Sequence, residues 1–231
     1  MSHKGEIIAY HGWGFDRNCW KEWQEILSSN FLFKTYDRGY FDQKYTPYFD
    51  DTEKIKIIFA HSFGLHLCYL EILKQANLII LFNSFAHFHP EKEKQKKRSK
   101  NALQLMINEF NNNPKTVLES FYKKCYYPFS SVNINCDTVD WEKLGKDLEL
   151  LNTSIVDINS LKKAPKIYII QSSKDRIINP SHAQELFNQL SHNSQYFNVE
   201  GVGHTLPFTD IQSCLPIVNQ ALGELENYGT Y

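Results

Sequence analysis

The sequence predicts an α/β fold in which helices cover a mostly parallel sheet. Short apolar runs rich in Ile, Leu and Phe alternate with segments of helical periodicity towards both ends of the chain, and such alternation is typical of parallel strands joined by crossover helices. The apolar run at residues 55–59 leads directly into a tight turn and then into apolar residues at helical spacing. A length of 231 residues suits one domain of this class.

The individual elements follow from the spacing of apolar residues. Strands are expected at residues 6–10, 31–36, 55–59, 78–82, 166–170 and 195–199. Helices are expected at residues 19–27, 181–190 and 211–226, and the apolar residues from Leu65 to Leu73 continue in a helical pattern after the turn. In a parallel sheet the loops after the strands share one edge, and ligands bind at that edge.

Residues 85–160 interrupt the alternation and are expected to form a helical cap, or lid, inserted into a core of residues 1–84 and 161–231. The segment 91–124 holds nine Lys and Arg against four Glu, a local charge of +5. Such a run is either a solvated helix face or a docking surface for an acidic partner. The aromatic residues of the cap either pack within it or line a cleft beneath it.

Ser62 lies at the turn after the strand at residues 55–59, in the pattern Ala60-x-Ser62-x-Gly64. Small residues on either side of a serine at a strand–turn–helix junction are typical of a nucleophile elbow, which exposes the hydroxyl at the edge of the sheet. Ala stands where the motif usually has its first Gly. Taken alone, Ser62 could also be a helix N-cap.

Asp175 and His204 follow two further apolar strands, so both are expected at the same edge as Ser62. The order Ser, Asp, His is that of a hydrolase triad, in which the imidazole takes the serine proton and the carboxylate orients the imidazole. Asp175 could instead be a turn residue, and Asp157 or Asp210 could be considered in its place. Neither alternative directly follows a strand, so we predict Ser62, Asp175 and His204 as the catalytic residues.

Two backbone N–H groups are expected to form an oxyanion hole. One belongs to Phe63, the residue after the nucleophile, and the other to Trp13 in the loop after the first strand. No metal or other cofactor is expected, because His87 and His89 have no carboxylate or cysteine partner at ligand spacing.

The composition restricts the partners and the compartment. A formal charge of −1 favours neither nucleic acid nor membrane as a partner. The five cysteines are odd in number and show no CxxC spacing, which indicates reduced thiols in a reducing compartment. No apolar signal core and no run of membrane-spanning length is visible. We therefore expect a soluble, cytoplasmic protein.

With these residues placed, the chain resembles the α/β-hydrolase superfamily and, within it, is similar to the pimeloyl-[acyl-carrier protein] methyl ester esterases of biotin synthesis. The likeness rests on residues 11–20, 62–64, 175–180 and 203–208, and more loosely on residues 147–157. Three features depart from the family pattern: the first hairpin is missing, residues 37–40 read Asp-Arg-Gly-Tyr, and Leu65 follows Gly64 where a second Gly is usual.

The resemblance implies a serine carboxylesterase that needs no cofactor and whose basic cap docks an acidic acyl-carrier protein. The residues that would bind substrate and carrier protein are Lys94, Lys96, Lys97, Arg98, Phe121 and Tyr122. Other catalytic interpretations are a general small-ester carboxylesterase, a thioesterase, or a lyase of the kind found in menaquinone synthesis. A hydrolase-like binding module is the alternative without catalysis, and the intact Ser62, Asp175 and His204 argue against it.

Overall fold

The structure is a computed structural model that describes residues 3–50, 54–131, 138–190 and 192–226. Six parallel strands form one sheet in the order β2-β1-β3-β4-β5-β6. The strands are β1 (Gly5–Tyr10), β2 (Phe31–Thr35), β3 (Ile55–His61), β4 (Leu78–Phe82), β5 (Lys166–Ser172) and β6 (Ser194–Val199). The predicted parallel sheet is confirmed, and every strand pair is parallel within the described part of the chain.

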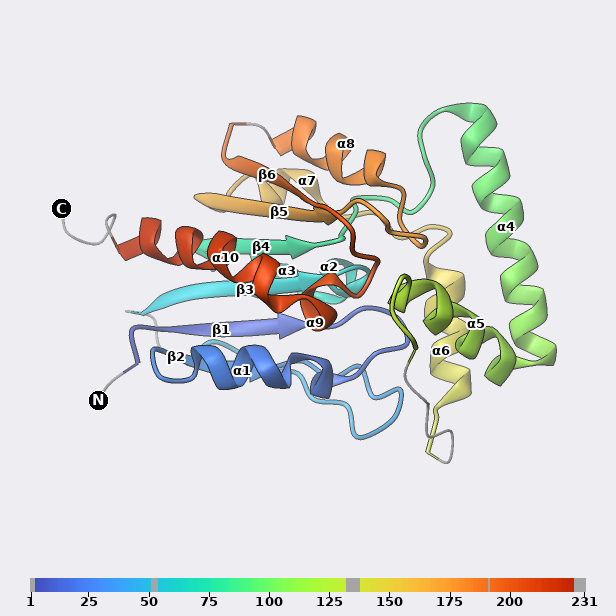
Figure 1. Ribbon diagram of the computed structural model, residues 1–231, viewed down its shortest axis with the longest axis horizontal. Coiled ribbons are helices and arrows are strands. Elements are labelled where there is room, and N and C mark those ends of the chain that lie inside the picture. The colour runs from blue at the N-terminus through green and yellow to red at the C-terminus, as the bar shows by residue number, and fades with distance from the viewer. Residues whose placement is uncertain (1–2, 51–53, 132–137, 191, 227–231) are drawn as a thin grey trace.

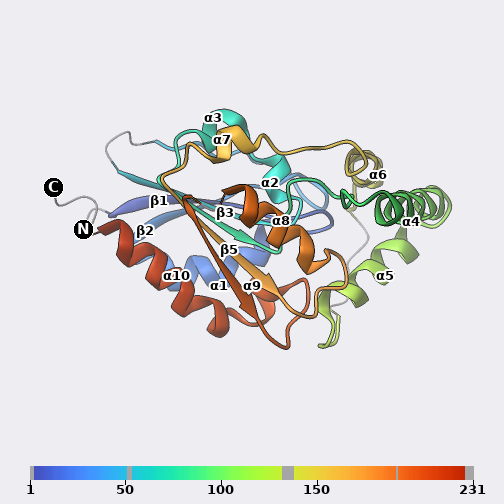
Figure 2. The same cartoon turned by 90° about the horizontal axis from the view of Figure 1, so that it is seen from above.

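Helices cover both faces of this sheet (Figures 1 and 2). One face packs against α1 (Lys21–Leu27), which follows the 3-10 helix η1 (Arg17–Trp20), and against α9 (Leu206–Thr209) and α10 (Ile211–Glu226). The other face packs against α2 (Gly64–Leu67), α3 (Leu70–Leu73), α7 (Ile158–Leu161) and α8 (Pro180–Leu190).

Side chains along one strand alternate between the two apolar clusters. Ile57 and Phe59 of β3 belong to the cluster beneath α1 and α10, whereas Ile58 and Ala60 belong to the cluster beneath α3 and α8. Because side chains of a strand point alternately to opposite faces, a strand covered on both faces is apolar at every position. This burial explains why the strands are visible in the sequence as continuous apolar runs.

The expected helix from Leu65 to Leu73 is wrong in one respect, because the segment forms two short helices. Cys68 and Tyr69 adopt extended backbone angles between α2 and α3. The break still lets Ile72 and Leu73 pack against the sheet. Apolar spacing does not indicate whether the backbone between two buried residues is continuous, so the pattern did not predict this break.

Three helices lie beyond the carboxyl ends of the strands, at one end of the molecule (Figure 1). They are α4 (Glu93–Asn112), α5 (Pro114–Tyr126) and α6 (Trp141–Leu150). Their apolar faces form a third cluster, which they share with Trp13, Phe63 and Phe85 at the edge of the sheet. The chain enters and leaves this region side by side, since His87 and Ile155 form an antiparallel bridge.

Candidate active site

Ser62 occupies the turn between β3 and α2 with φ of 53°, in the left-handed region that non-glycine residues rarely adopt. Its N–H donates to the carbonyl of Phe82 at 3.0 Å, which fastens the turn to β4. Close packing requires the small residue at Gly64, where a Cβ would lie 2.5 Å from the carbonyl oxygen of Tyr10. This geometry is that of a nucleophile elbow.

The three predicted catalytic side chains meet at the edge of the sheet. The Ser62 hydroxyl lies 2.9 Å from His204 Nε2, and His204 Nδ1 lies 2.8 Å from Asp175 Oδ2. The other oxygen, Oδ1 of Asp175, accepts the N–H groups of Ile177 and Ile178 at 2.8 and 2.9 Å. With Asp175 accepting from Nδ1–H, Nε2 is left as the acceptor for the serine proton.

The two alternative aspartates serve elsewhere. Asp157 caps α7 by accepting N–H groups of Asn159 and Ser160. Asp210 accepts hydrogen bonds from Ser213 at the start of α10. Local helix caps of this kind account for both carboxylates.

The two residues predicted to form an oxyanion hole lie in segments that meet beside Ser62. A Cβ on Gly12 would lie 3.0 Å from Ser62 Cβ, so the loop after β1 passes directly against the nucleophile. Trp13 and Phe63 are both buried, and no described residue accepts a hydrogen bond from the backbone N–H of either one. Their role as oxyanion donors stays a prediction.

A cavity of about 590 Å³ opens at Ser62 between the edge of the sheet and the cap helices. Apolar residues predominate in its lining, which also includes the charged side chains of Glu109, Lys124 and Arg176. Phe121 lines this cavity. The walls come from several elements and are formed by Trp13, Ser62, Phe63, Phe85, Phe88, Ser99, Ala102, Leu103, Leu105, Met106, Glu109, Thr116, Val117, Ser120, Phe121, Lys124, Leu148, Leu151, Arg176, Ile177 and Ile178.

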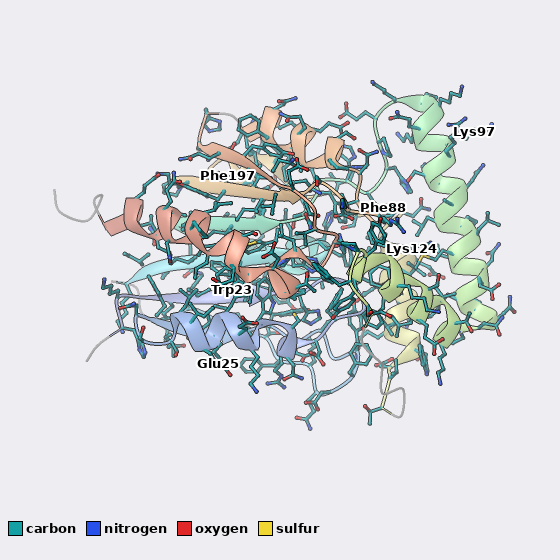
Figure 3. All side chains as sticks on the ribbon, viewed as in Figure 1. Trp23, Glu25, Phe88, Lys97, Lys124 and Phe197 are labelled. Atoms are coloured by element: carbon teal, nitrogen blue, oxygen red, sulfur yellow. The ribbon has the colours of Figure 1, made fainter. Side chains whose placement is uncertain are left out.

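The other predicted binding residues do not line the cavity. Tyr122 is buried, and its hydroxyl donates to the carbonyl of Gly14, so it holds α5 to the loop after β1. Lys94, Lys96, Lys97 and Arg98 lie in the first turns of α4, where all but the half-buried Lys96 are exposed. Figure 3 shows Lys97 on the outer side of α4, while Phe88 lies between α4 and the core.

Several residues around the triad were not singled out by their sequence pattern. His61 is fully buried, and its Nε2 lies 2.9 Å from the carbonyl oxygen of His204. Burial and the neighbouring His204 hold the pKa of His61 well below its ordinary value. Arg176 lines the cavity and stacks on the ring of Tyr127. The sequence feature that could have indicated Arg176 as a cavity residue is its position directly after Asp175.

Among the described residues, no three His, Cys, Asp or Glu side chains are grouped so as to hold a metal ion. The helices among them are too short or too polar to cross a membrane. Cys19, Cys68, Cys125 and Cys214 are free thiols, and Cys136 lies outside the described residues.

Sequence comparison matches the chain to no protein-family model and to no curated protein. By structure, the chain is similar to a hydrolase from Oleispira antarctica, with a TM-score of 0.77 and 17% identity over 95% of this chain and 91% of that chain. It is also similar to an esterase from Exiguobacterium antarcticum, with a TM-score of 0.78 and 14% identity over 96% and 93% of the two chains.

A further similar structure is that of MenH from S. aureus, with a TM-score of 0.72 and 14% identity over 97% of this chain and 95% of that chain. At identities this low, similarity in structure establishes the path of the chain, whereas an activity has to be argued from the site itself.

Proposed function

Because the chain has the α/β-hydrolase fold, we propose that it is a serine esterase with Ser62 as its nucleophile. One observation carries the proposal: the hydrogen-bonded series Ser62, His204 and Asp175 opens into an apolar cavity. A serine hydroxyl is a weak nucleophile until a base removes its proton, and His204 Nε2 is at hydrogen-bond distance to do so.

The reaction proceeds through an acyl-enzyme. Ser62 Oγ attacks the ester carbonyl carbon while His204 Nε2 takes the hydroxyl proton, and Asp175 stabilises the imidazolium that forms. The N–H groups of Trp13 and Phe63 bind the oxyanion. When the bond from carbon to the alcohol oxygen breaks, His204 returns the proton to the leaving alcohol. Water then attacks the acyl-enzyme with His204 as base, which releases the acid and restores Ser62.

The proposed substrate is the methyl ester of a pimeloyl group carried on acyl-carrier protein, so that the alcohol released is methanol. The motif likeness at residues 11–20 and 175–180 supports this choice. A largely apolar cavity between α4 and α5 suits a linear acyl chain. The exposed basic side chains of α4 and the cations Lys124 and Arg176 in the cavity lining suit an acidic carrier with a phosphate-bearing arm.

The test is intact mass spectrometry of pimeloyl-carrier protein methyl ester incubated with wild type and with Ser62→Ala. Loss of the mass of one methylene group with wild type alone supports the proposal and identifies the nucleophile. If the substrate stays intact while short p-nitrophenyl esters are cleaved, a general small-ester carboxylesterase replaces it. Release of the whole acyl group from the carrier identifies a thioesterase.

The carrier-protein surface is tested separately by reversing charge on α4. Lys97→Glu with Arg98→Glu is expected to raise KM for the carrier-bound ester and to reduce the salt dependence of its turnover, while short esters are cleaved as before. Lys162→Glu with Lys163→Glu is the matched control, because these adjacent exposed basic residues follow α7, ahead of β5. Equal effects of the two pairs would remove the docking surface from the proposal.

A further inference from the structure

Asn83 occupies an unusual position directly after β4. Its side chain is completely buried, and its φ of 47° lies in the left-handed region. Asn is one of the few residues other than Gly that adopts this region readily. The turn directs the amide towards the ends of the neighbouring strands, where the catalytic loops begin.

Every polar atom of the Asn83 amide has a partner. Oδ1 accepts from the backbone N–H and the hydroxyl of Ser172, at 2.8 and 3.1 Å. Nδ2 donates to the carbonyl oxygen of His204 at 2.8 Å and approaches that of Gly203 at 3.4 Å. A single side chain therefore joins the end of β4 and the end of β5 to the loop that carries the catalytic base.

The next residue holds the nucleophile in the same way. The hydroxyl of Ser84 lies 3.1 Å from the carbonyl oxygen of Ser62 and 3.2 Å from that of Ala60. Two consecutive buried residues thus contact the backbone of the nucleophile and the backbone of the base. The turn after β4 therefore contacts both backbones through neighbouring side chains.

The loop around His204 depends on such contacts. It contains Gly201, whose φ is 86°, and Gly203, where a Cβ would overlap the carbonyl oxygen of Tyr127. Glycines loosen the backbone, so bonds from outside the loop must fix the imidazole. The carbonyl oxygen of His204 receives two of them, from Asn83 Nδ2 and from His61 Nε2 at 2.8 and 2.9 Å.

We propose that Asn83 is a positioning residue for catalysis, which places His204 against Ser62 by holding the His204 carbonyl. The inference rests on the proposed esterase function. Catalysis by a serine and a histidine needs their reacting atoms at hydrogen-bond distance, and a displacement of about 1 Å costs on the order of 100-fold in rate. Asn83 touches neither the substrate nor the reacting atoms, and it acts through the backbone of the base.

The test uses Asn83→Gly, since Gly tolerates the positive φ while the amide is deleted. We expect kcat for a p-nitrophenyl ester to fall on the order of 10- to 100-fold with KM nearly unchanged, and fluorophosphonate labelling of Ser62 to slow in proportion. Asn83→Asp keeps the acceptor for Ser172 and places an oxygen against the His204 carbonyl, so it should lose at least as much activity.

Asn193→Gly is the matched control. Its amide also donates to a backbone carbonyl, that of Ala164 at 2.6 Å, but it precedes β6 at the opposite end of the sheet. This variant should lose stability and keep kcat. The role of Asn83 would be overturned if folded Asn83→Gly had the same kcat as the wild type. It would also be overturned if kcat fell as much in Asn193→Gly as in Asn83→Gly.

A second measurement does not depend on esterase activity. Proton NMR of the wild type should show the His204 Nδ1 proton far downfield, because it is hydrogen-bonded to the Asp175 carboxylate at 2.8 Å. In Asn83→Gly that resonance should broaden or shift as the imidazole moves, whereas an unchanged resonance would refute the positioning role. A wild type that cleaves no ester but passes this test would refute only the esterase proposal.

Discussion

The helices α6 and α4 both contribute to the cavity, yet they are attached to the protein in opposite ways. Asp147 of α6 accepts two hydrogen bonds from the Arg38 guanidinium, at 2.6 and 2.7 Å, and one from the Tyr40 hydroxyl at 2.7 Å. The carbonyl of Leu144 on the same helix accepts from the indole of Trp13 at 2.8 Å. Through these bonds α6 is fastened to the loops after β1 and β2.

By contrast, α4 lies at the outer side of the cap (Figure 1). Within the described part of the chain, two side-chain hydrogen bonds lead from α4 to residues outside it, one between Ser99 and His89 at 2.8 Å and one from the amide of Asn113, the next residue along the chain, to Glu109 at 2.8 Å. Its inner face, which includes Leu103 and Phe110, packs into the cap cluster, and its first turns carry exposed basic residues.

The difference separates two tasks. The Arg38–Asp147 pair and the other side-chain bonds make α6 a fixed wall that belongs to the folded core, so changes there should lower stability. Exposed side chains on α4 contribute little to the stability of the fold. They are therefore available to bind a partner. Four experiments test this contrast.

The largest effect is expected for Asp147→Ala. The substitution leaves the Arg38 guanidinium and the Tyr40 hydroxyl without their acceptor, and breaking a buried pair in this way costs about 3 kcal/mol or more. Urea denaturation should show the loss as a lower midpoint. Glu149→Ala on the exposed side of α6 should stay within about 0.5 kcal/mol of wild type. Equal midpoints for the two variants would contradict the contrast.

A matched pair of leucines compares the two walls directly. Leu148 on α6 and Leu105 on α4 both line the cavity, but Leu148 is 1% exposed and Leu105 is 70% exposed. Leu148→Ala should destabilise the protein by about 2–4 kcal/mol, because it leaves a void in the cap cluster. Leu105→Ala should cost less than about 0.5 kcal/mol. The idea of a fixed and a free wall fails if both leucines cost the same.

The link between α2 and the segment after α6 should be sensitive to pH. His66 Nδ1 lies 2.7 Å from the Ser154 hydroxyl and Nε2 lies 3.1 Å from the carbonyl of Phe85, and burial lowers the pKa of His66 to about 4. Between pH 6.5 and about 4 the unfolded chain therefore binds a proton that the folded chain does not, so stability falls as the pH falls.

The size of this effect is at most about 1.4 kcal/mol per pH unit for one histidine. Urea midpoints measured from pH 7 to pH 4 should decline less steeply for His66→Gln, since an amide can keep both hydrogen bonds without titrating. Parallel pH profiles for the two proteins would show that His66 does not contribute.

The smallest effect, and one of opposite sign, is expected for Lys94→Glu in the first turn of α4. A carboxylate near a helix N-terminus interacts favourably with the helix dipole, and the new side chain would face Arg98 one turn later. We expect a gain of about 0.3–1 kcal/mol at low salt that fades as salt is added. A loss of more than about 1 kcal/mol would mean that Lys94 has a structural role.

The meeting of Ser62, Asp175 and His204 was predictable because each of them follows a strand of the parallel sheet. Most of these strands are continuous apolar runs, and the residue after each run lies at one edge of the sheet wherever the strand falls in the order. Ser62, Asp175 and His204 therefore needed no knowledge of long-range contacts. The tight turn at Ser62 was likewise indicated by the small residues around it.

Other features were invisible in the sequence. Asn83 looked like an ordinary residue after a strand, because its partners lie far along the chain, at the end of β5 and in the loop around His204. Tyr122 was predicted to bind substrate with Phe121. Since neighbouring residues on a helix point about 100° apart, Phe121 lines the cavity and Tyr122 packs beneath it.

The order of amino acids was sufficient to predict the α/β class, the parallel strands and the meeting of Ser62, Asp175 and His204 at one edge of the sheet, because periodicity and strand ends are local properties of the chain. Packing in three dimensions was needed to establish which residues line the cavity, how α6 is attached, and which side chains contact the backbone of His204. Arg38 and Asp147 are 109 positions apart in the chain. The residues next to each of them in the sequence do not indicate which residue it pairs with. Their pairing depends on how the cap packs onto the sheet, and contacts between distant segments leave no periodic pattern in the sequence.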